Sequence, residues 1–178
     1  MTVTIRPSQA GDLLAIQAIY AHHVRHGLGS FEEVAPDVAE IGRRRQDLIA
    51  HGFRYLTALL QGRVAGYAYA SPYMTRSAYR FTVQDSIYIA PDGLRQGVGR
   101  ALLGRLIEEC SAQGFRQMIA IVGDSANEGS IHLHRALGFA PVGTLKAVGF
   151  KFGRWVDSVL LQRALGTGDA TPADKTGV

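Results

Sequence analysis

Two glycines, Gly97 and Gly99, stand one residue apart in the stretch LRQGVGRAL, directly after a run that alternates like a strand. Because glycine has no Cβ, a backbone with two closely spaced glycines can come very near a ligand. The residues that follow have helical spacing, and the first amides of a helix point outward without an intrahelical partner. With the positive end of the helix dipole they would bind an anion such as a phosphate or pyrophosphate. A strand-to-helix turn that uses glycine for geometry alone is the alternative, and these residues do not decide between the two.

Other chemistries leave little trace in the chain. The phosphate-binding pattern G-x-x-x-x-G-K-[ST] and the metalloprotease pattern H-E-x-x-H do not occur, and the glycine turn lacks the third glycine of a dinucleotide fingerprint. His22 and His26 are four residues apart, but no carboxylate pattern accompanies them, so we expect no metal site. The single cysteine, Cys110, excludes an intrachain disulfide and a cysteine-based zinc cluster, and its place in an apolar helical stripe predicts a core residue.

The composition of the 178 residues, 47% hydrophobic and 19% charged, is that of an ordinary globular domain. The net charge of +4 would suit nucleic acid, but the basic run from Arg43 to Arg45 lies in a helical segment without interleaved aromatic residues. We interpret it as a solvated face and the positive charge as suited to a polyanionic small ligand. No apolar run approaches the roughly 20 residues that span a bilayer. The N-terminal stretch also lacks the apolar region of a signal peptide. We therefore expect a cytoplasmic protein that binds neither nucleic acid nor membrane.

The glycine turn lies within an ordered series of strands and helices. Strand-like alternation opens the chain at VTIRP, and helical spacing follows first Ser8 or Asp12 and then Asp37. After these come a hairpin at FRYLTALL and RVAGYAYASPY, a strand at FTVQDSIYIA, a helix at residues 97–112, a strand at RQMIAIV, a short helix at SIHLHRAL and a closing hairpin at TLKAVGFKFGRWVDSVLLQ. This order predicts an α+β fold with a single mixed twisted β-sheet of about seven strands flanked by about four helices. We expect the domain to cover residues 1–165, and the small, polar residues 166–178 to form a disordered tail.

The order of strand, glycine turn, helix, strand and short helix ending in Gly-Phe resembles the GCN5-related N-acetyltransferases, the GNAT superfamily. Within it, the chain is similar to the phosphinothricin and methionine sulfoximine acetyltransferase group from IRPSQAGDLLAIQAIYAHHV to VGFKFGRWVDSVLLQ, which omits little beyond the tail. The segment KFGRW followed by Asp157 is the most specific for that group. The two superfamily motifs are Arg95-Gln96-Gly97-Val98-Gly99-Arg100 after Ser86-Ile87-Tyr88-Ile89, and Asn127-x-x-Ser130-Ile131-x-Leu133-His134-x-x-Leu137-Gly138-Phe139.

The resemblance implies a metal-free enzyme that transfers the acetyl group of acetyl-CoA to the primary amine of a small amino acid or analogue, such as phosphinothricin or methionine sulfoximine. It places the CoA pyrophosphate at the glycine turn, with Arg95 and Arg100 adding charge at the rim. It places the pantetheine arm along the strand at Ile87, whose amide would stabilise the oxyanion. The implied cofactor-binding residues are Ile87, Tyr88, Ile89, Arg95, Gln96, Gly97, Val98, Gly99, Arg100, Asn127, Ser130 and His134.

Three residues are catalytic candidates under this resemblance. His134 stands where the group has histidine and the wider superfamily tyrosine, placed to protonate the CoA sulfur. A histidine at the edge of a packed helix is the alternative. The group reads T-V-E-x-S where this chain reads TVQDS, so Gln84, which cannot take a proton, replaces the proposed base. Asp85 can substitute only if the strand is bulged there, because neighbours on a regular strand point to opposite faces.

The acceptor amine is expected between the loop after the first helix, the strand at Gln84 and the closing hairpin. Four cations in this region would pair with an amino acid's carboxylate or a phosphinate-like group, although each alone is more often a surface residue. Val34 falls where the group often has glutamate, leaving Glu32 and Glu33, so the inference to phosphinothricin itself is weaker. The implied substrate-binding residues are Phe31, Met74, Thr75, Arg76, Arg80, Gln84, Asp85, Ser86, Lys151 and Arg154.

Gln84 in the base position also suggests a different class of protein, an acetyl-CoA-binding sensor with little or no transfer activity. Loss of one carboxylate need not abolish transfer, because an amine of lowered pKa or a chain of water molecules can supply the deprotonated nucleophile. The sequence therefore favours the enzyme, and turnover over a panel of amines discriminates the two. The resemblance further implies a homodimer, with the closing hairpin and the loop of residues 27–36 near the partner.

Overall fold

Among residues 2–173, seven strands form one mixed sheet, which confirms the α+β fold predicted from the sequence. The computed structural model describes residues 2–173. The strands lie in the order β1-β2-β3-β4-β5-β7-β6, with β4 and β5 parallel and the other neighbours antiparallel. Their bounds are β1 Val3–Pro7, β2 Tyr55–Leu60, β3 Arg63–Pro72, β4 Thr82–Ile89, β5 Gln117–Gly123, β6 Ala140–Lys151 and β7 Arg154–Ala164.

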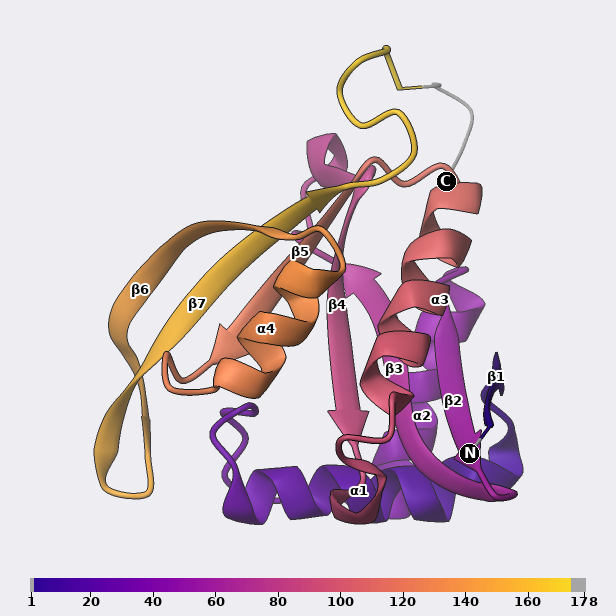
Figure 1. Ribbon diagram of the computed structural model, residues 1–178, viewed down its shortest axis with the longest axis vertical. Coiled ribbons are helices and arrows are strands. Elements are labelled where there is room, and N and C mark those ends of the chain that lie inside the picture. The colour runs from indigo at the N-terminus through magenta and orange to yellow at the C-terminus, as the bar shows by residue number, and fades with distance from the viewer. Residues whose placement is uncertain (1, 174–178) are drawn as a thin grey trace.

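Helices cover both faces of this sheet (Figure 1). The α-helices are α1 Leu13–His26, α2 Val38–Ala50, α3 Val98–Ala112 and α4 Glu128–Ala136. A cluster of buried apolar residues lies on each face of the sheet. One cluster packs against α1 and α2, and the other against α3 and α4. Successive side chains of a strand point to opposite faces, so one strand contributes to both clusters. Tyr55 of β2 packs in the cluster with Ile16 of α1, whereas its neighbour Leu56 packs in the cluster of α3. Within residues 2–173, no helix is long and apolar enough to cross a membrane.

The helix starts follow local side-chain chemistry. Asp37 at the start of α2 accepts a hydrogen bond from the amide three residues on, at 2.8 Å, and Asn127 does the same for α4 at 3.3 Å. Each such cap contributes about 1 kcal/mol to helix stability. Asp12 precedes α1 without capping it, because its carboxylate pairs with Arg6 at 2.7 Å and accepts from the amide of Gln9.

The strands β4 and β5 separate after a short parallel pairing. Their ladder joins Thr82 to Gln117 and ends with the pair of Gln84 and Ile119. On its other side β4 stays paired with β3 as far as Ile89. Figure 1 shows the two strands diverging from this point. Beyond this point the edge of β4 has unpaired main-chain donors and acceptors, which can bond to a ligand between the two strands. The divergence therefore creates a binding site along β4.

Residues 166–173 follow β7 as a series of turns. The Arg116 guanidinium donates to the carbonyl of Thr171 at 2.7 Å and also to the hydroxyl of Thr167. Leu165, directly before this segment, is buried. The tail predicted from the sequence covered residues 166–178, of which 174–178 lie outside the described residues.

Candidate active site

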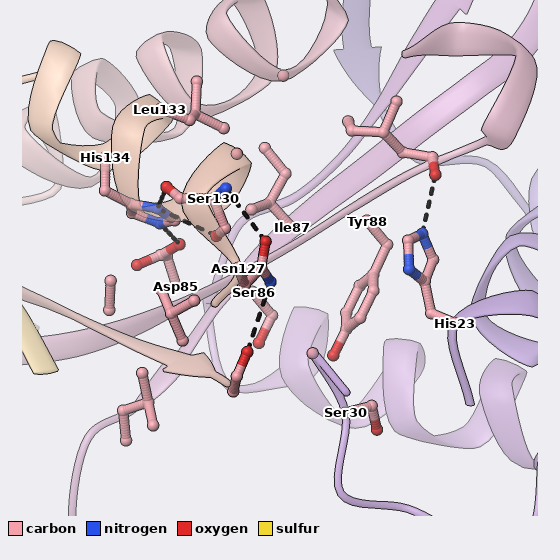
Figure 2. Close-up of a pocket in the computed structure, with 18 of the residues that line it drawn as sticks. His23, Ser30, Asp85, Ser86, Ile87, Tyr88, Asn127, Ser130, Leu133 and His134 are labelled. Carbon is pink, nitrogen blue, oxygen red and sulfur yellow. Dashed lines mark hydrogen bonds and ion pairs between the residues drawn. The ribbon is translucent and has the colours of Figure 1, made fainter. Parts of the chain in front are cut away.

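A cavity of about 910 Å³ opens where β4 and β5 separate. Its walls come from β4, the end of β5, the first turn of α3, α4, and the part of the chain that runs from α1 into the following loop. Figure 2 shows side chains from α4 on one side of β4 and from α1 on the other. Its volume is at the upper end of what small-molecule sites in proteins enclose.

The first turn of α3 forms one end of the cavity. Gly97 has a φ of 81°, in the left-handed region that favours glycine, and stands directly before the first helical residue. No described side chain caps this helix, so its first amides are available to an anion. Arg95 and Arg100 line the same end. A Cβ on Gly99 would lie 3.1 Å from Leu133, so glycine there also lets α3 approach α4. This end suits a compact polyanion.

The C-terminal end of β4 is held by His23 of α1. Its Nε2 donates to the carbonyl oxygen of Ile89 at 2.8 Å, which requires the proton to be on Nε2. Burial lowers the pKa of His23 in spite of this bond, so the ring is neutral at pH 7. The Tyr88 ring lies between His23 and Tyr20, with centroid distances of 5.4 and 5.0 Å. These contacts fix one face of β4 against α1, while the edge of β4 that β5 leaves after Gln84 borders the cavity.

A polar cluster of Tyr20, Ser30, Glu32 and Arg44 borders the α1 side of the cavity. The Tyr20 hydroxyl is 2.8 Å from Glu32 Oε1 and 2.9 Å from Ser30 Oγ, and Arg44 donates to Glu32 at 2.6 Å. Burial, with a smaller contribution from Glu32, raises the pKa of Tyr20 to about 12, so its hydroxyl keeps its proton and donates to the carboxylate. The cluster therefore offers hydrogen-bonding groups to a polar ligand.

Gln84 and Asp85 point to opposite faces of β4. The ladder with β3 has a regular register here, pairing Ser71 with Gln84 and Ala70 with Asp85. Gln84 is half-buried on the face toward α1, whereas Asp85 is only 6% exposed on the face covered by α3 and α4. The bulge that would let Asp85 take the place of the group's glutamate is therefore absent between β3 and β4.

Asp85 instead contacts His134 of α4 (Figure 2). Its Oδ2 lies 3.0 Å from the ring Nε2, and both side chains are 2% exposed. The ring Nδ1 lies 2.7 Å from the carbonyl oxygen of Ser130, one turn earlier in α4. Burial alone would lower the pKa of His134, but the Asp85 carboxylate and the Ser130 carbonyl outweigh it and hold that pKa above its usual value.

Most of the residues that form these walls lie in the part of the chain that matches a known family. Residues 16–139 match the model of the acetyltransferase (GNAT) family, a span that contains most of α1, all of α2, α3 and α4, and β4. The chain belongs to this family. It is therefore an acetyltransferase, as the resemblance of its motifs predicted.

Similar proteins cover almost the whole chain. A phosphinothricin N-acetyltransferase of Alcaligenes faecalis is 56% identical over 168 residues, which are 94% of this chain and 85% of the relative. An L-methionine sulfoximine/L-methionine sulfone acetyltransferase of Salmonella typhimurium is 34% identical over 163 residues, 92% of this chain and 95% of the relative. The crystal structure of a GNAT phosphinothricin acetyltransferase from Sinorhizobium meliloti in complex with acetyl-CoA matches with a TM-score of 0.96 at 47% identity, over 99% of this chain and 96% of that one.

Most of the cofactor-binding residues predicted for this GNAT enzyme line the cavity. Gln96 does not, because its side-chain amide donates to the carbonyl of Asp92 at 2.5 Å. The predicted residues that line the cavity are Ile87, Tyr88, Ile89, Arg95, Gly97, Val98, Gly99, Arg100, Asn127, Ser130 and His134.

The predicted substrate-binding residues divide into two sets. Phe31, Gln84, Asp85 and Ser86 line the cavity. Three of the cations outside it have partners within the chain. Arg154 pairs with Asp124 at 2.6 Å, Arg80 stacks on Phe81 with 4.5 Å to the ring centroid, and Lys151 donates to two main-chain carbonyls. The residues outside the cavity are Met74, Thr75, Arg76, Arg80, Lys151 and Arg154.

Several lining residues of the GNAT site have no motif that identifies them. Tyr20 and His23 lie on α1 and Tyr69 on β3, and the periodicity that predicts these elements explains them equally well as core residues. Glu32 has a weak signal, because Glu32 and Glu33 are the acidic residues left near the position where Val34 replaces the group's glutamate. Spacing within one element does not show which other element its side chains will face.

Lys151 is 2% exposed and anchors the loop after α1. Its Nζ donates to the carbonyl oxygens of Gly27 at 3.0 Å and Ser30 at 2.7 Å. Burial lowers the pKa of Lys151, and the charges of Glu33 and Glu32 oppose this. Because Ser30 lines the cavity, the closing hairpin supports the site through this lysine.

The variant Lys151→Met should loosen that loop. Methionine keeps the apolar stem but removes the donor from two carbonyls, so the free energy of unfolding should fall by about 1–3 kcal/mol. The KM for the acceptor should rise severalfold. Urea denaturation and steady-state kinetics measure the two effects. Lys146→Met is the matched control, because its exposed ammonium pairs with Asp157 at the surface and contributes at most about 1 kcal/mol. An unchanged acceptor KM in Lys151→Met would contradict the anchoring role.

Proposed function

We propose that this protein transfers the acetyl group of acetyl-CoA to the primary amine of an amino-acid analogue of the phosphinothricin or methionine sulfoximine kind, and that it works in the cytoplasm. The observation that carries the proposal is one continuous cavity, which runs from the anion-binding turn at Gly97 along β4 to the polar side chain of Glu32. Acetyl transfer needs such adjoining sites, because the amine must be held within contact distance of the thioester carbon. The names of the relatives support this class of acceptor.

The residues of the cavity fit acetyl-CoA as the acyl donor. The first amides of α3, with Arg95 and Arg100, would hold the pyrophosphate. The open edge of β4 from Ile87 to Ile89 would bond to the amide groups of the pantetheine arm as a neighbouring strand would. When bound, the thioester supplies an activated acetyl group beside Gln84. No group of three or more metal-ligating side chains occurs among residues 2–173.

Acetyl transfer requires a deprotonated amine, a stabilised oxyanion and a proton for the leaving sulfur. The Ile87 amide would donate to the oxyanion, and His134 would supply the proton. Gln84 faces the acceptor side, where its amide can hydrogen-bond the amine but cannot take a proton. Deprotonation is then left to water or to the polar cluster at Glu32.

Thiol release from acetyl-CoA tests the proposal directly. We expect the wild-type protein to release thiol with phosphinothricin or methionine sulfoximine and to form the N-acetyl product, with methionine sulfone and the twenty amino acids as the comparison panel. Gln84→Glu should raise kcat/KM at neutral pH by about tenfold or more, because it places a base on the acceptor side. Gln84→Leu, which adds no base, is the control. Turnover by Gln84→Glu but not by the wild type would favour the acetyl-CoA sensor over the enzyme. The activities named for the relatives favour the enzyme.

We infer that two copies of the chain associate through the outer part of the closing hairpin. β6 is the last strand of the sheet, and almost all of its residues are exposed. An apolar patch of this kind at a sheet edge is typical of an interface between proteins. The apolar side chains, between 49% and 67% exposed, are Val142, Leu145, Val148, Phe150 and Trp155.

The double variant Phe150→Lys/Trp155→Lys should therefore be a monomer. The two rings contact each other edge to face at 5.2 Å, and lysines there would place charge in the centre of the interface. We expect sedimentation equilibrium to give twice the chain mass for the wild type and the single chain mass for the variant. Leu14→Lys, at an exposed apolar residue of α1, is the control and should leave the dimer intact. A wild-type protein that sediments as a monomer would exclude the interface.

A further inference from the structure

We propose that Asp85 is a positioning residue, which acts through His134 and keeps that ring doubly protonated and fixed at the cavity wall. The inference starts from two side chains of β4 and α4 that are joined at 3.0 Å between Oδ2 and Nε2 and are each 2% exposed. Its consequence for catalysis rests on the proposed function, whereas the protonation state of the ring does not. Asp85 thus takes a role different from that of a base for the amine.

The Nδ1 atom of the His134 ring carries a proton. It lies 2.7 Å from the carbonyl oxygen of Ser130, and a carbonyl oxygen can only accept a hydrogen bond. The Ser130 amide in turn donates to the Asn127 side chain, which fixes this first turn of α4. The orientation of the ring is therefore set by its own helix.

A second proton lies between Nε2 and Asp85. Without it, the lone pair of Nε2 would face a buried carboxylate oxygen, which both repulsion and burial oppose. With the proton on Nε2, the pair is an imidazolium bonded to a carboxylate and has no net charge. The raised pKa of His134, which Asp85 and the Ser130 carbonyl cause against the effect of burial, favours this form over a neutral ring beside a carboxylic acid.

The groups packed around the pair do not replace Asp85. The Phe139 ring meets His134 edge-on at 5.1 Å and carries no charge. Burial, with smaller parts from the charges of Glu109 and Asp85, raises the pKa of Cys110 in α3. Burial also raises the pKa of Tyr69, which packs on the opposite face of the sheet, so both groups stay protonated. Oδ1 of Asp85 is buried with no hydrogen-bond partner among the described residues. The charge of this carboxylate is therefore compensated mainly by His134.

In the transfer step the pair would give up and regain one proton. As the acceptor nitrogen bonds to the acetyl carbon, the carbon–sulfur bond breaks and its electron pair goes to sulfur. The Nε2 proton of His134 then leaves its hydrogen bond to Asp85 Oδ2 and goes to sulfur. Asp85 and the neutral ring then hold one negative charge until the proton lost by the acceptor nitrogen restores the pair. A carboxylate that stabilises the protonated ring keeps this donor charged at neutral pH.

Nitrogen-15 NMR of the His134 ring in the full chain tests the inference. At about pH 7.5, a unit above the ordinary histidine pKa, the wild type should have protons on both ring nitrogens. Asp85→Asn should have one on Nδ1 alone, because only the Ser130 carbonyl then opposes the effect of burial. Asp85→Glu should retain part of the wild-type behaviour. Asp47→Asn, an exposed carboxylate on α2, is the matched control and should leave the ring signals unchanged.

Kinetics supply the second readout. The basic limb of the kcat profile should move to lower pH in Asp85→Asn, and kcat above neutral pH should fall about 10²-fold with little change in the KM for acetyl-CoA. Thermal unfolding shows whether each variant is folded at the assay temperature. A wild-type ring with one proton at about pH 7.5, or an Asp85→Asn ring that titrates like the wild type, overturns the inference. Because NMR needs no turnover, a doubly protonated ring in a protein inactive toward every amine would overturn only the proposed function.

Discussion

Replacing His134 with glutamine should lower kcat for acetyl transfer by a factor of about 10² to 10⁴. Glutamine keeps a hydrogen-bond donor near Asp85 but has no proton to give to the leaving sulfur. The KM for acetyl-CoA should change little, because the turn at Gly97 that we propose to hold the CoA pyrophosphate belongs to the start of α3 and not to this ring. Steady-state kinetics at saturating acceptor separate the two parameters.

The control lies on the same helix. His132→Gln removes an exposed imidazole two residues away, so kcat should change by less than about twofold. Equal losses in the two variants would indicate damage to α4 and contradict the proton-donor role. Unchanged kcat in His134→Gln would contradict it as well.

The pH dependence of stability adds a second signature of the His134 pair. Its pKa is raised in the folded chain, so its contribution to stability is fully present below the ordinary value of about 6.5 and is lost as the pH rises through the raised value. The difference in Tm between the wild type and His134→Gln should therefore be largest in mild acid and shrink at alkaline pH.

The variant Gly123→Ala should disrupt the acceptor side of the cavity. A Cβ at this position would overlap the Leu28 carbonyl oxygen and lie 3.2 Å from the Phe31 ring. The obstacle is backbone, so the loop after α1 must move away from β5. We expect the free energy of unfolding to fall by about 1–3 kcal/mol and kcat/KM for the acceptor to fall by about tenfold or more. Urea denaturation and acceptor titrations measure the two quantities.

Gly104→Ala provides the comparison. This glycine lies within α3, and a Cβ there meets nothing within 4 Å. Alanine should stabilise the helix by roughly 0.5–1 kcal/mol and leave the kinetics unchanged. If Gly123→Ala were as well tolerated as Gly104→Ala, the close contact between β5 and the loop would have no functional importance.

The order of the elements could be predicted because local periodicity reflects burial. Val98, Leu102 and Leu106 recur at four-residue intervals, and all three are buried in α3. The glycine turn is equally local, since the left-handed φ of Gly97 and the first amides of α3 belong to one short stretch of chain. The catalytic roles assigned to residues of the site stay predictions for the kinetic tests above.

The sequence by itself therefore determined the series of strands and helices and the glycine turn before α3, because each depends on residues close together in the chain. Only the tertiary structure decided what Asp85 and Lys151 do. Asp85 meets a ring 49 residues away on α4, and Lys151 donates to carbonyls more than 120 residues earlier. The residues next to a carboxylate or an ammonium in the sequence do not show whether that group will be solvated, paired or buried. Its role depends on which distant groups the packing of helices against the sheet brings within hydrogen-bond distance.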